Sequence, residues 1–195
     1  MAKIEIIDNK YIFLGNYPQS GTVPEPIKWQ IIKKEDNVYT VMTEKIIINF
    51  MYDRYYSEYK GSAVRKYVNH EFIPSAFTYE ELNLILLTDL GDGVVDKVYV
   101  PTVEELSCLS KEERIRKVTP YAQSNNASSY PVTYKSERYL LGNGWYWTRT
   151  PYKPAYNPKC DREVWYVEYN GSFNARVTTG HDIGIVMFMR IQIDE

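Results

Sequence analysis

Hydrophobic positions along the chain follow two different periods, and this divides the sequence into three parts. Near both ends, short runs rich in Val, Ile, Tyr and Trp alternate with turn residues, which is typical of strands. These runs lie at residues 3–7, 11–14, 27–32 and 38–42, and again at 145–148, 163–169, 172–179 and 185–193, with a further short run at 98–100. Residues 15–26 hold three prolines and two glycines, so we expect a loop there.

Between these groups of strands, polar caps precede apolar residues at helical spacing. Ser62 can cap a helix that runs to about Phe72, in which Val64, Val68 and Phe72 lie on one face. Capping boxes indicate further helix starts: Thr78 with Glu81, before the apolar residues 82–87 and ended by Gly91 and Gly93, then Thr102 with Glu105, and Ser110 with Glu113. Strands, then helices, then strands favour an α+β fold with antiparallel sheets.

The organisation of the chain predicts one domain. The sequence has 195 residues, and neither an internal repeat nor a long linker divides it, so we expect a single domain over residues 1–195. Residues 123–137 form a long, polar, irregular stretch. Loops of this length are uncommon in compact domains and are often functional or mobile, so the sequence leaves the order of this stretch open.

The strongest local signal is a predicted β-hairpin near the C-terminus. Asn170-Gly171 lies between two strand-forming runs, and this pair is typical of the two-residue type I′ turn, in which both positions need a positive φ. Such a turn fixes how the strands pair. On the first face Tyr169 then opposes Ser172, Val167 opposes Asn174 and Trp165 opposes Arg176; on the second, Glu168 opposes Phe173, Tyr166 opposes Ala175 and Val164 opposes Val177.

The two faces of this predicted hairpin differ in character. The second face is small and apolar apart from Glu168, so we assign it to the core. The first face brings the rings of Trp165 and Tyr169 together with the amide of Asn174 and the guanidinium of Arg176, a mixture that suits recognition. An alternative stays open, in which Trp165 and Arg176 are only a cation–π pair that stiffens an exposed sheet.

Composition argues against several classes of function. Lys and Arg total 23 and Asp and Glu total 25, and this near-balance argues against a protein that binds nucleic acid through phosphate contacts. No apolar run approaches the roughly 20 residues that cross a bilayer, and the first residues contain no hydrophobic export segment, so we expect a cytoplasmic protein. The 19 tyrosines fit either an aromatic binding surface or the codon bias of an A/T-rich genome.

Residues that carry chemistry are few. Cys108 and Cys160 lie far apart in the sequence, and we expect buried, inert thiols in a reducing compartment. With His70 and His181 they do not give the paired spacing of a zinc site, so the sequence predicts neither a metal nor a cofactor. The aspartate-rich segment at 89–96 lacks calcium-loop spacing and is interpreted as a turn that ends a helix.

Several motifs occur in an order that resembles a known family. They are L-G-N-Y-P-Q at 14–19, P-I-K-W-Q-I at 26–31, S-A-V-R-K-Y-V-N-H-E-F at 62–72, A-F at 76–77, T-P-Y-A at 119–122, W-Y-W-T-R-T-P at 145–151 and the glycine-led strand at 184–185. Together they resemble a bacterial and phage family of unknown function that looks like a branch of the C-type-lectin-like fold. That fold is related to the formylglycine-generating enzyme and to the variable proteins of diversity-generating retroelements.

The resemblance implies an α+β domain with twisted antiparallel sheets, two to three flanking helices and long loops on one side. In that superfamily the C-terminal strands and their loops form the ligand surface, which here means residues 152–162 and the hairpin. Two features depart from the pattern: Val186-Met187 stands where the family has Arg-Pro, and the calcium-lectin motifs are absent. A calcium-bridged sugar site is therefore not implied.

The tryptophans and one arginine of these motifs are expected to be structural. We expect Trp29, Trp145 and Trp147 to belong to the core and scaffold. Arg149 lies between two threonines and precedes Pro151, and we expect it to hold a loop through a carboxylate or through backbone carbonyls.

The function expected from the sequence is non-catalytic binding of a protein or a carbohydrate, with a protein slightly favoured, by a domain in the cytoplasm or on a virion. No nucleic acid, membrane or cofactor is expected. The candidate ligand-binding residues are Tyr152, Tyr156, Trp165, Tyr169, Phe173, Asn174 and Arg176. Two alternatives stay open: an enzyme of the formylglycine-generating type or a thiol-dependent variant using Cys160, and a phage-encoded inhibitor of a host protein.

Overall fold

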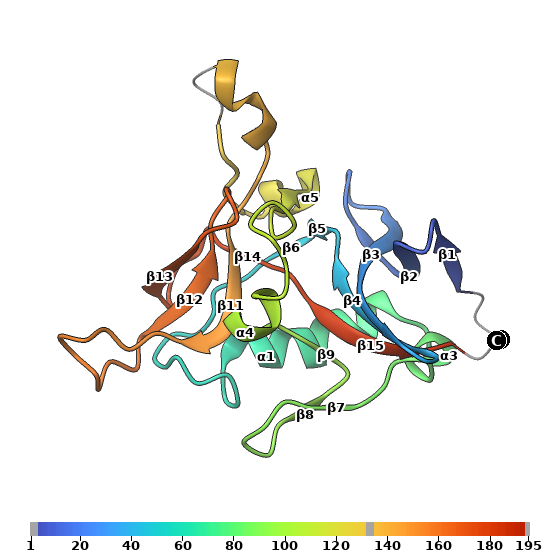
Figure 1. Ribbon diagram of the computed structural model, residues 1–195, viewed down its shortest axis with the longest axis horizontal. Coiled ribbons are helices and arrows are strands. Elements are labelled where there is room, and N and C mark those ends of the chain that lie inside the picture. The colour runs from blue at the N-terminus through green and yellow to red at the C-terminus, as the bar shows by residue number, and fades with distance from the viewer. Residues whose placement is uncertain (1–3, 132–134, 194–195) are drawn as a thin grey trace.

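The computed structural model describes residues 4–131 and 135–193 and has a mixed α+β architecture made mostly of sheets (Figure 1). This confirms the predicted class and the predicted order of strands, helices and strands. The buried side chains form one continuous cluster, which is contributed by both main sheets and by the helices between them. Within the described residues, no helix is long and apolar enough to cross a membrane.

The first main sheet has six strands and is curled. Its spatial order is β1 (Glu5–Ile7), β2 (Tyr11–Pro18), β3 (Pro24–Glu35), β4 (Val38–Thr43), β15 (Phe188–Gln192) and β9 (Val98–Tyr99). The loop predicted at 15–26 is confirmed only for residues 19–23, because β2 extends to Pro18 and β3 begins at Pro24. A register shift between Phe13 and Asn16, with Gly15 at φ 73°, bends the ladder so that the prolines pair at its end.

The second main sheet has five strands and carries the C-terminal hairpin. Its order is β13 (Phe173–Val177), β12 (Glu163–Val167), β11 (Tyr146–Pro151), β14 (Gly184–Ile185) and β6 (Ile48–Asn49), in which β11 and β14 are parallel. Two small ladders complete the strands: β10 (Lys117–Val118) with β5 (Lys45–Ile46), and β7 (Thr88–Asp89) with β8 (Val95–Asp96).

The last predicted strand joins the two main sheets. Residues 185–193 were expected to form one strand, but β14 ends at Ile185 in one sheet and β15 begins at Phe188 in the other. Val186 and Met187 lie between them and are fully buried. The backbone of Met187 exchanges hydrogen bonds with Thr43, at the end of β4, and so fixes the place where the chain changes sheets.

The predicted helix after Ser62 is confirmed. The Ser62 side chain accepts a hydrogen bond from the backbone N–H of Arg65 and caps α1 (Ala63–Tyr67), which continues as the π-helical turn η1 (Val68–Phe72) and as α2 (Ile73–Ala76). Val64, Val68 and Phe72 are fully buried, as their spacing predicts.

The second predicted helix is much shorter than expected. Thr78 and Glu81 form the capping box, but α3 (Tyr79–Leu82) is a single turn. Leu86 donates its backbone N–H to Arg190, and Ile85 forms a β-bridge with Ile191, so residues 84–86 run along β15 instead. Gly91 and Gly93 belong to the turn of the β7–β8 ribbon and do not end a helix.

The remaining short helices are α4 (Val103–Leu106), α5 (Pro120–Ser124) and the 3₁₀ turn η2 (Lys135–Leu140). Thr102 and Glu105 form the predicted capping box of α4. Ser110 and Glu113 make capping hydrogen bonds as well, but these close only a turn. Of the stretch 123–137, residues 132–134 lie outside the described part, and the segment that carries η2 projects from the body of the molecule (Figure 1).

The three tryptophans belong to the core and its surroundings, as predicted. Trp29 and Trp147 are fully buried, and their indole N–H groups donate to the carbonyls of Leu14 and Phe50. Trp145 is only half-buried and lies beside the core.

Candidate functional site

The hairpin forms between β12 and β13, but with a different turn from the one predicted. The backbone N–H of Gly171 donates to Glu168, and the N–H of Glu168 donates to Ser172, which leaves a three-residue loop. Gly171 has φ 82°, whereas Asn170 does not adopt a positive φ. This is a type I turn followed by a glycine bulge, in which the Asn170 side chain accepts a hydrogen bond from the N–H of Ser172.

This turn moves the strand register by one residue. Trp165 pairs with Ala175, Val164 pairs with Arg176 and Tyr166 pairs with Asn174. A shift of one residue exchanges the faces of a strand relative to its partner. The predicted pairing is therefore wrong, and so is the alternative cation–π pair, because Trp165 and Arg176 point to opposite sides of the sheet.

The structure divides the predicted ligand-binding residues between these two sides. Trp165 and Phe173 share one face of the hairpin, and Asn174 and Arg176 share the other face with Tyr166. The polar members already have partners: Asn174 donates to the Glu168 carboxylate at 3.0 Å, and Arg176 pairs with Asp182 at 2.8 Å. The single mixed surface expected from the sequence is not formed.

The tip of the hairpin is covered by another segment of the chain. The Arg114 side chain donates to the carbonyl of Gly171 at 2.9 Å and lies 4.4 Å from the centre of the Phe173 ring. Tyr169 stacks on Tyr130 with ring centres 4.1 Å apart and meets the edge of Trp145. The rings of Phe173 and Tyr169 are therefore used mainly in contacts within the protein.

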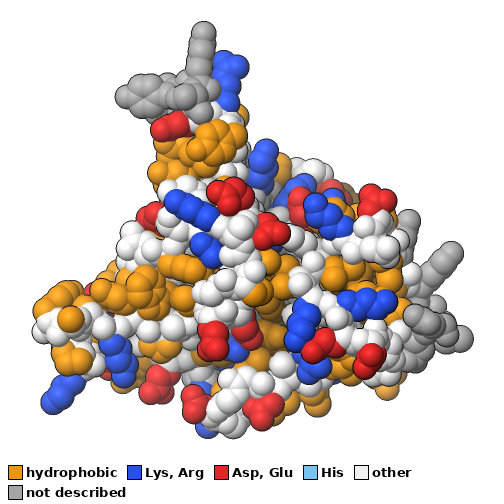
Figure 2. All heavy atoms as spheres, viewed as in Figure 1, with side chains coloured by type: hydrophobic (Ala, Val, Ile, Leu, Met, Phe, Trp, Pro, Cys, Tyr) orange, Lys and Arg blue, Asp and Glu red, His pale blue; other side chains and the backbone are white. Residues whose placement is uncertain are grey.

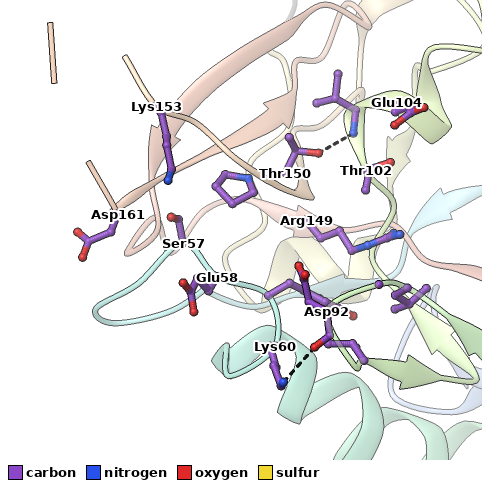
Figure 3. A pocket seen from close by; sticks show the side chains of 16 residues that line it. Ser57, Glu58, Lys60, Asp92, Thr102, Glu104, Arg149, Thr150, Lys153 and Asp161 are labelled. Atoms are coloured by element: carbon purple, nitrogen blue, oxygen red, sulfur yellow. Dashed lines mark hydrogen bonds between the residues drawn. The ribbon is translucent and has the colours of Figure 1, made fainter. Parts of the chain in front are cut away.

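Beside this sheet lies an open cavity of about 900 Å³, which we call the four-loop groove (Figure 3). Its walls come from four segments, residues 57–60, 90–94, 102–104 and 149–161. These segments precede α1, connect β7 to β8, begin α4, and follow from the end of β11. Loops that are distant in the sequence thus enclose one space, as binding sites commonly require.

Arg149 holds one side of the groove, in the way the sequence predicted. Its guanidinium donates to both carboxylate oxygens of Glu105, at 2.7 and 3.1 Å, and to the carbonyl of Val100 at 2.9 Å. Glu105 is also the acid of the α4 capping box, and Thr150 accepts a hydrogen bond from the N–H of Val103. The end of β11 is therefore fixed to the start of α4 by a two-point ion pair.

Asp53 organises the loop on the opposite side. One carboxylate oxygen accepts hydrogen bonds from the N–H groups of Tyr55 and Tyr56, and the other accepts from Ala63 at the start of α1. Partial burial favours a raised pKa for Asp53, but these three donors outweigh it and hold the pKa below its ordinary value. The backbone N–H of Ser57 then donates to the carbonyl of Asp161, which joins this loop to the loop after β11.

Two further contacts complete the walls. Lys60 donates from its ammonium group to the carbonyl of Asp92 at 3.0 Å and so connects two segments of the groove (Figure 3). The hydroxyl of Tyr59 accepts a hydrogen bond from the N–H of Val100, and burial raises the pKa of this tyrosine well above its ordinary value. Tyr59 is therefore neutral and serves as a fixed part of the wall.

Two of the loops that line the groove also carry exposed tyrosines outside its lining, and we call these three residues the tyrosine rim. Tyr55 and Tyr56 are 52% and 60% exposed, and Tyr156, on the loop after β11, is 85% exposed. Figure 2 shows hydrophobic side chains, in orange, gathered on that loop at the left of the view. Tyr152 follows the lining residue Pro151 and meets the edge of the half-buried Trp165, with ring centres 4.9 Å apart.

Of the predicted ligand-binding residues, Tyr152 and Tyr156 lie on the segment 149–161, other residues of which line the groove, and Trp165 contacts Tyr152. Sequence reasoning missed Tyr55 and Tyr56, although a signal was present. Residues 53–59 read D-R-Y-Y-S-E-Y and come directly before the helix cap, so a short tyrosine-rich loop held at a helix start was visible in the sequence.

Comparison with known proteins gives one family. Residues 36–192 match the family described as Domain of unknown function (DUF6273). The chain belongs to this family. No curated protein and no solved structure is similar enough to count as a match.

The chemistry offered by the groove of this DUF6273 domain is that of charged and hydroxyl groups. The described residues contain no group of three or more His, Cys, Asp or Glu side chains arranged to hold a metal ion.

The prediction of two buried thiols is wrong for Cys108, which is exposed because the single turn of α4 ends just before it. Cys160 is half-buried and precedes Asp161, which lines the groove.

Proposed function

We propose that this DUF6273 domain is a non-catalytic binding domain that recognises a protein or a carbohydrate in the four-loop groove and on its tyrosine rim. The observation that carries the proposal is an open cavity of about 900 Å³, two of whose lining loops also carry three tyrosines that are more than half exposed. This volume lies toward the upper end of the range for pockets that hold ligands. The hairpin face expected from the sequence is replaced by this neighbouring surface.

The rigidity of the walls supports the proposal. The bidentate pair of Arg149 with Glu105 holds the end of β11 at the start of α4, and the three hydrogen bonds to Asp53 hold the loop before α1. Loops that are fixed in this way lose little conformational entropy when a ligand binds, so more of the contact energy appears as affinity. Exposed tyrosine rings add contact area at a small entropic cost because each ring has only two side-chain torsions.

A protein ligand is supported better than a neutral carbohydrate. The groove presents exposed carboxylates and ammonium groups from separate loops, such as Glu58, Asp161 and Lys153. Full charges of both signs match a polypeptide surface, whereas a neutral sugar gives them no opposite charge to pair with.

We further propose that the fold is a branch of the C-type-lectin-like fold, as the resemblance of the motifs implies. Antiparallel sheets with helices alongside and loops at one end support that assignment.

A second candidate function is thiol-dependent chemistry at Cys160. Its support is the position of this half-buried thiol, which precedes the lining residue Asp161 in the sequence but does not itself line the groove. If the groove is catalytic, Cys160→Ser abolishes turnover of any substrate found to bind there. If the groove only binds, the same variant keeps the affinity of the parent protein.

The test of the proposed function compares two sets of tyrosine variants. The rim variant combines Tyr55→Ala, Tyr56→Ala and Tyr156→Ala. The control variant combines Tyr79→Ala and Tyr139→Ala, which remove rings that are also highly exposed but belong to segments that do not line the groove. Both variants are compared with the parent protein on a glycan array and against a displayed library of random peptides.

We expect ligands captured by the parent protein to be lost by the rim variant and retained by the control variant. Thermal unfolding of each variant shows whether its fold is intact. Ligands that bind the intact rim variant as well as they bind the parent would remove the groove from the proposal.

A further inference from the structure

The charges that line the four-loop groove are unbalanced toward the acidic side. The exposed ionisable side chains of its walls are the carboxylates of Glu58, Asp92, Glu104 and Asp161 and the ammonium groups of Lys60 and Lys153. Arg149 also lines the cavity, but its charge is already matched by Glu105. Each of the four segments contributes a carboxylate, so negative charge surrounds the space (Figure 3).

These four carboxylates form no ion pair with the described part of the chain. The ion pairs that occur there join Lys33 with Glu35, Arg65 with Asp96, Arg149 with Glu105, and Arg176 with Asp182. Lys60 donates to the backbone carbonyl of Asp92 and not to its carboxylate. The carboxylates of the groove are therefore available to pair with an external positive charge.

The tyrosine rim also favours a positively charged ligand, for a reason that does not involve these carboxylates. Tyr156 and the pair Tyr55 and Tyr56 come from the two loops that the hydrogen bond from Ser57 to Asp161 joins. The face of a tyrosine ring attracts ammonium and guanidinium groups. In this protein Arg54 already lies 5.6 Å from the centre of the Tyr55 ring, and Lys28 lies 3.7 Å from that of Tyr11.

We propose that the four-loop groove binds an extended polypeptide segment that carries Lys or Arg side chains; this rests on the proposed function. The carboxylates stand on four separate segments around a cavity of about 900 Å³, so they are spread out. Several positive groups spaced along a chain can meet them at once, and one compact cation cannot. Long basic side chains also cover tyrosine rings with their apolar stems while their charged ends reach the acids.

The first part of the test selects ligands without assuming their composition. A displayed library of random peptides is bound to the parent protein, and the recovered peptides are passed over the rim variant. Peptides that the rim variant fails to retain depend on the groove. We expect this pool to be enriched in Lys and Arg relative to the starting library.

The second part measures the contribution of the carboxylates. The charge variant combines Glu58→Gln, Asp92→Asn, Glu104→Gln and Asp161→Asn. A matched control removes the same charge at exposed positions outside the groove, through Asp36→Asn, Glu71→Gln, Glu80→Gln and Glu112→Gln. Affinity for one synthetic basic peptide from the selected pool is followed by fluorescence anisotropy at low salt. We expect the charge variant to lose roughly 10- to 100-fold in affinity, and the control to lose much less.

Salt dependence gives a second readout of the same contacts. Raising the ionic strength weakens binding to the parent protein, and this dependence becomes smaller in the charge variant because fewer charged contacts remain to be screened. A charge variant that binds the basic peptide as tightly as the control does would overturn the inference.

The outcomes separate this inference from the proposed function. Groove-dependent peptides without an excess of basic residues, or groove-dependent capture of neutral glycans alone, overturn the basic ligand and leave the binding groove standing. Peptides and glycans that bind the folded rim variant as well as the parent overturn the proposed function together with the inference.

Discussion

Arg114 donates a hydrogen bond from Nε to the carbonyl oxygen of Gly171, over a distance of 2.9 Å. The same guanidinium lies 4.4 Å from the centre of the Phe173 ring. Residues more than fifty positions away in the sequence therefore hold the hairpin tip, and the backbone of Lys111 is packed against the glycine. Through these contacts the hairpin tip packs against the 111–114 segment.

The first prediction concerns Gly171. It has φ 82°, and a Cβ atom there would lie 1.9 Å from the carbonyl oxygen of Lys111. Gly171→Ala is expected to lower the free energy of unfolding by about 2 to 4 kcal/mol, from backbone strain and from displacement of the 111–114 segment. Urea unfolding measures this loss. Gly61→Ala is the control, because Gly61 has open space around it and no positive φ, and its loss is expected to be below about 1 kcal/mol.

The second prediction concerns the bidentate ion pair of Arg149 with Glu105. Its side chain is 9% exposed and donates to both oxygens of Glu105, a geometry that a lysine cannot reproduce. Arg149→Lys is expected to cost about 1 to 3 kcal/mol in urea unfolding, because the second hydrogen bond and the contact with Val100 are lost. Arg176→Lys tests the contrast: its pair with Asp182 is about 40% exposed, and its expected loss is within about 0.5 kcal/mol. Equal losses in the free energy of unfolding for the two variants would mean that the bidentate geometry of Arg149 adds no stability.

The third prediction concerns acid and Asp53. Three backbone N–H groups hold the pKa of this carboxylate below its value in the unfolded chain, so the folded state binds its proton less readily. Asp53 therefore stabilises the fold above the unfolded pKa, and this contribution disappears as the pH falls through the folded pKa.

Urea unfolding across the range from about pH 6 down to about pH 2 measures this contribution. Asp53→Asn is expected to lower the free energy of unfolding at neutral pH, since an amide offers one acceptor oxygen where the carboxylate offers two. The free energy of unfolding of this variant should also fall less steeply as the pH is lowered. If stability falls as steeply with acid in Asp53→Asn as in the parent protein, other carboxylates account for the pH dependence.

The fourth prediction concerns the two thiols. Cys108 is exposed and Cys160 is half-buried, so Cys108 is expected to react faster with a water-soluble disulfide reagent. In such a titration Cys108→Ser removes the fast phase and Cys160→Ser removes the slow one. The opposite order would mean that the thiol beside the groove is activated, which would favour the thiol-dependent alternative.

Local signals in the sequence determined where helices start and the class of the fold. Ser62, the pair Thr78 and Glu81, and the pair Thr102 and Glu105 cap their helices as predicted, because each hydrogen bond joins residues only three positions apart. The period of the apolar residues also placed most strands and the buried face of α1 and η1. Such contacts depend on short-range geometry that the sequence states directly.

Tertiary structure decided how far those elements extend and what they expose. Residues 84–86 follow β15 because its backbone offers partners that a short helix end lacks. The hairpin takes a three-residue turn with its tip held by Arg114, and the resulting register places Arg176 and Asn174 on the face opposite Trp165. The four-loop groove depends on partners 44 positions apart, as in Arg149 with Glu105, and such pairs are chosen by packing that no local pattern encodes.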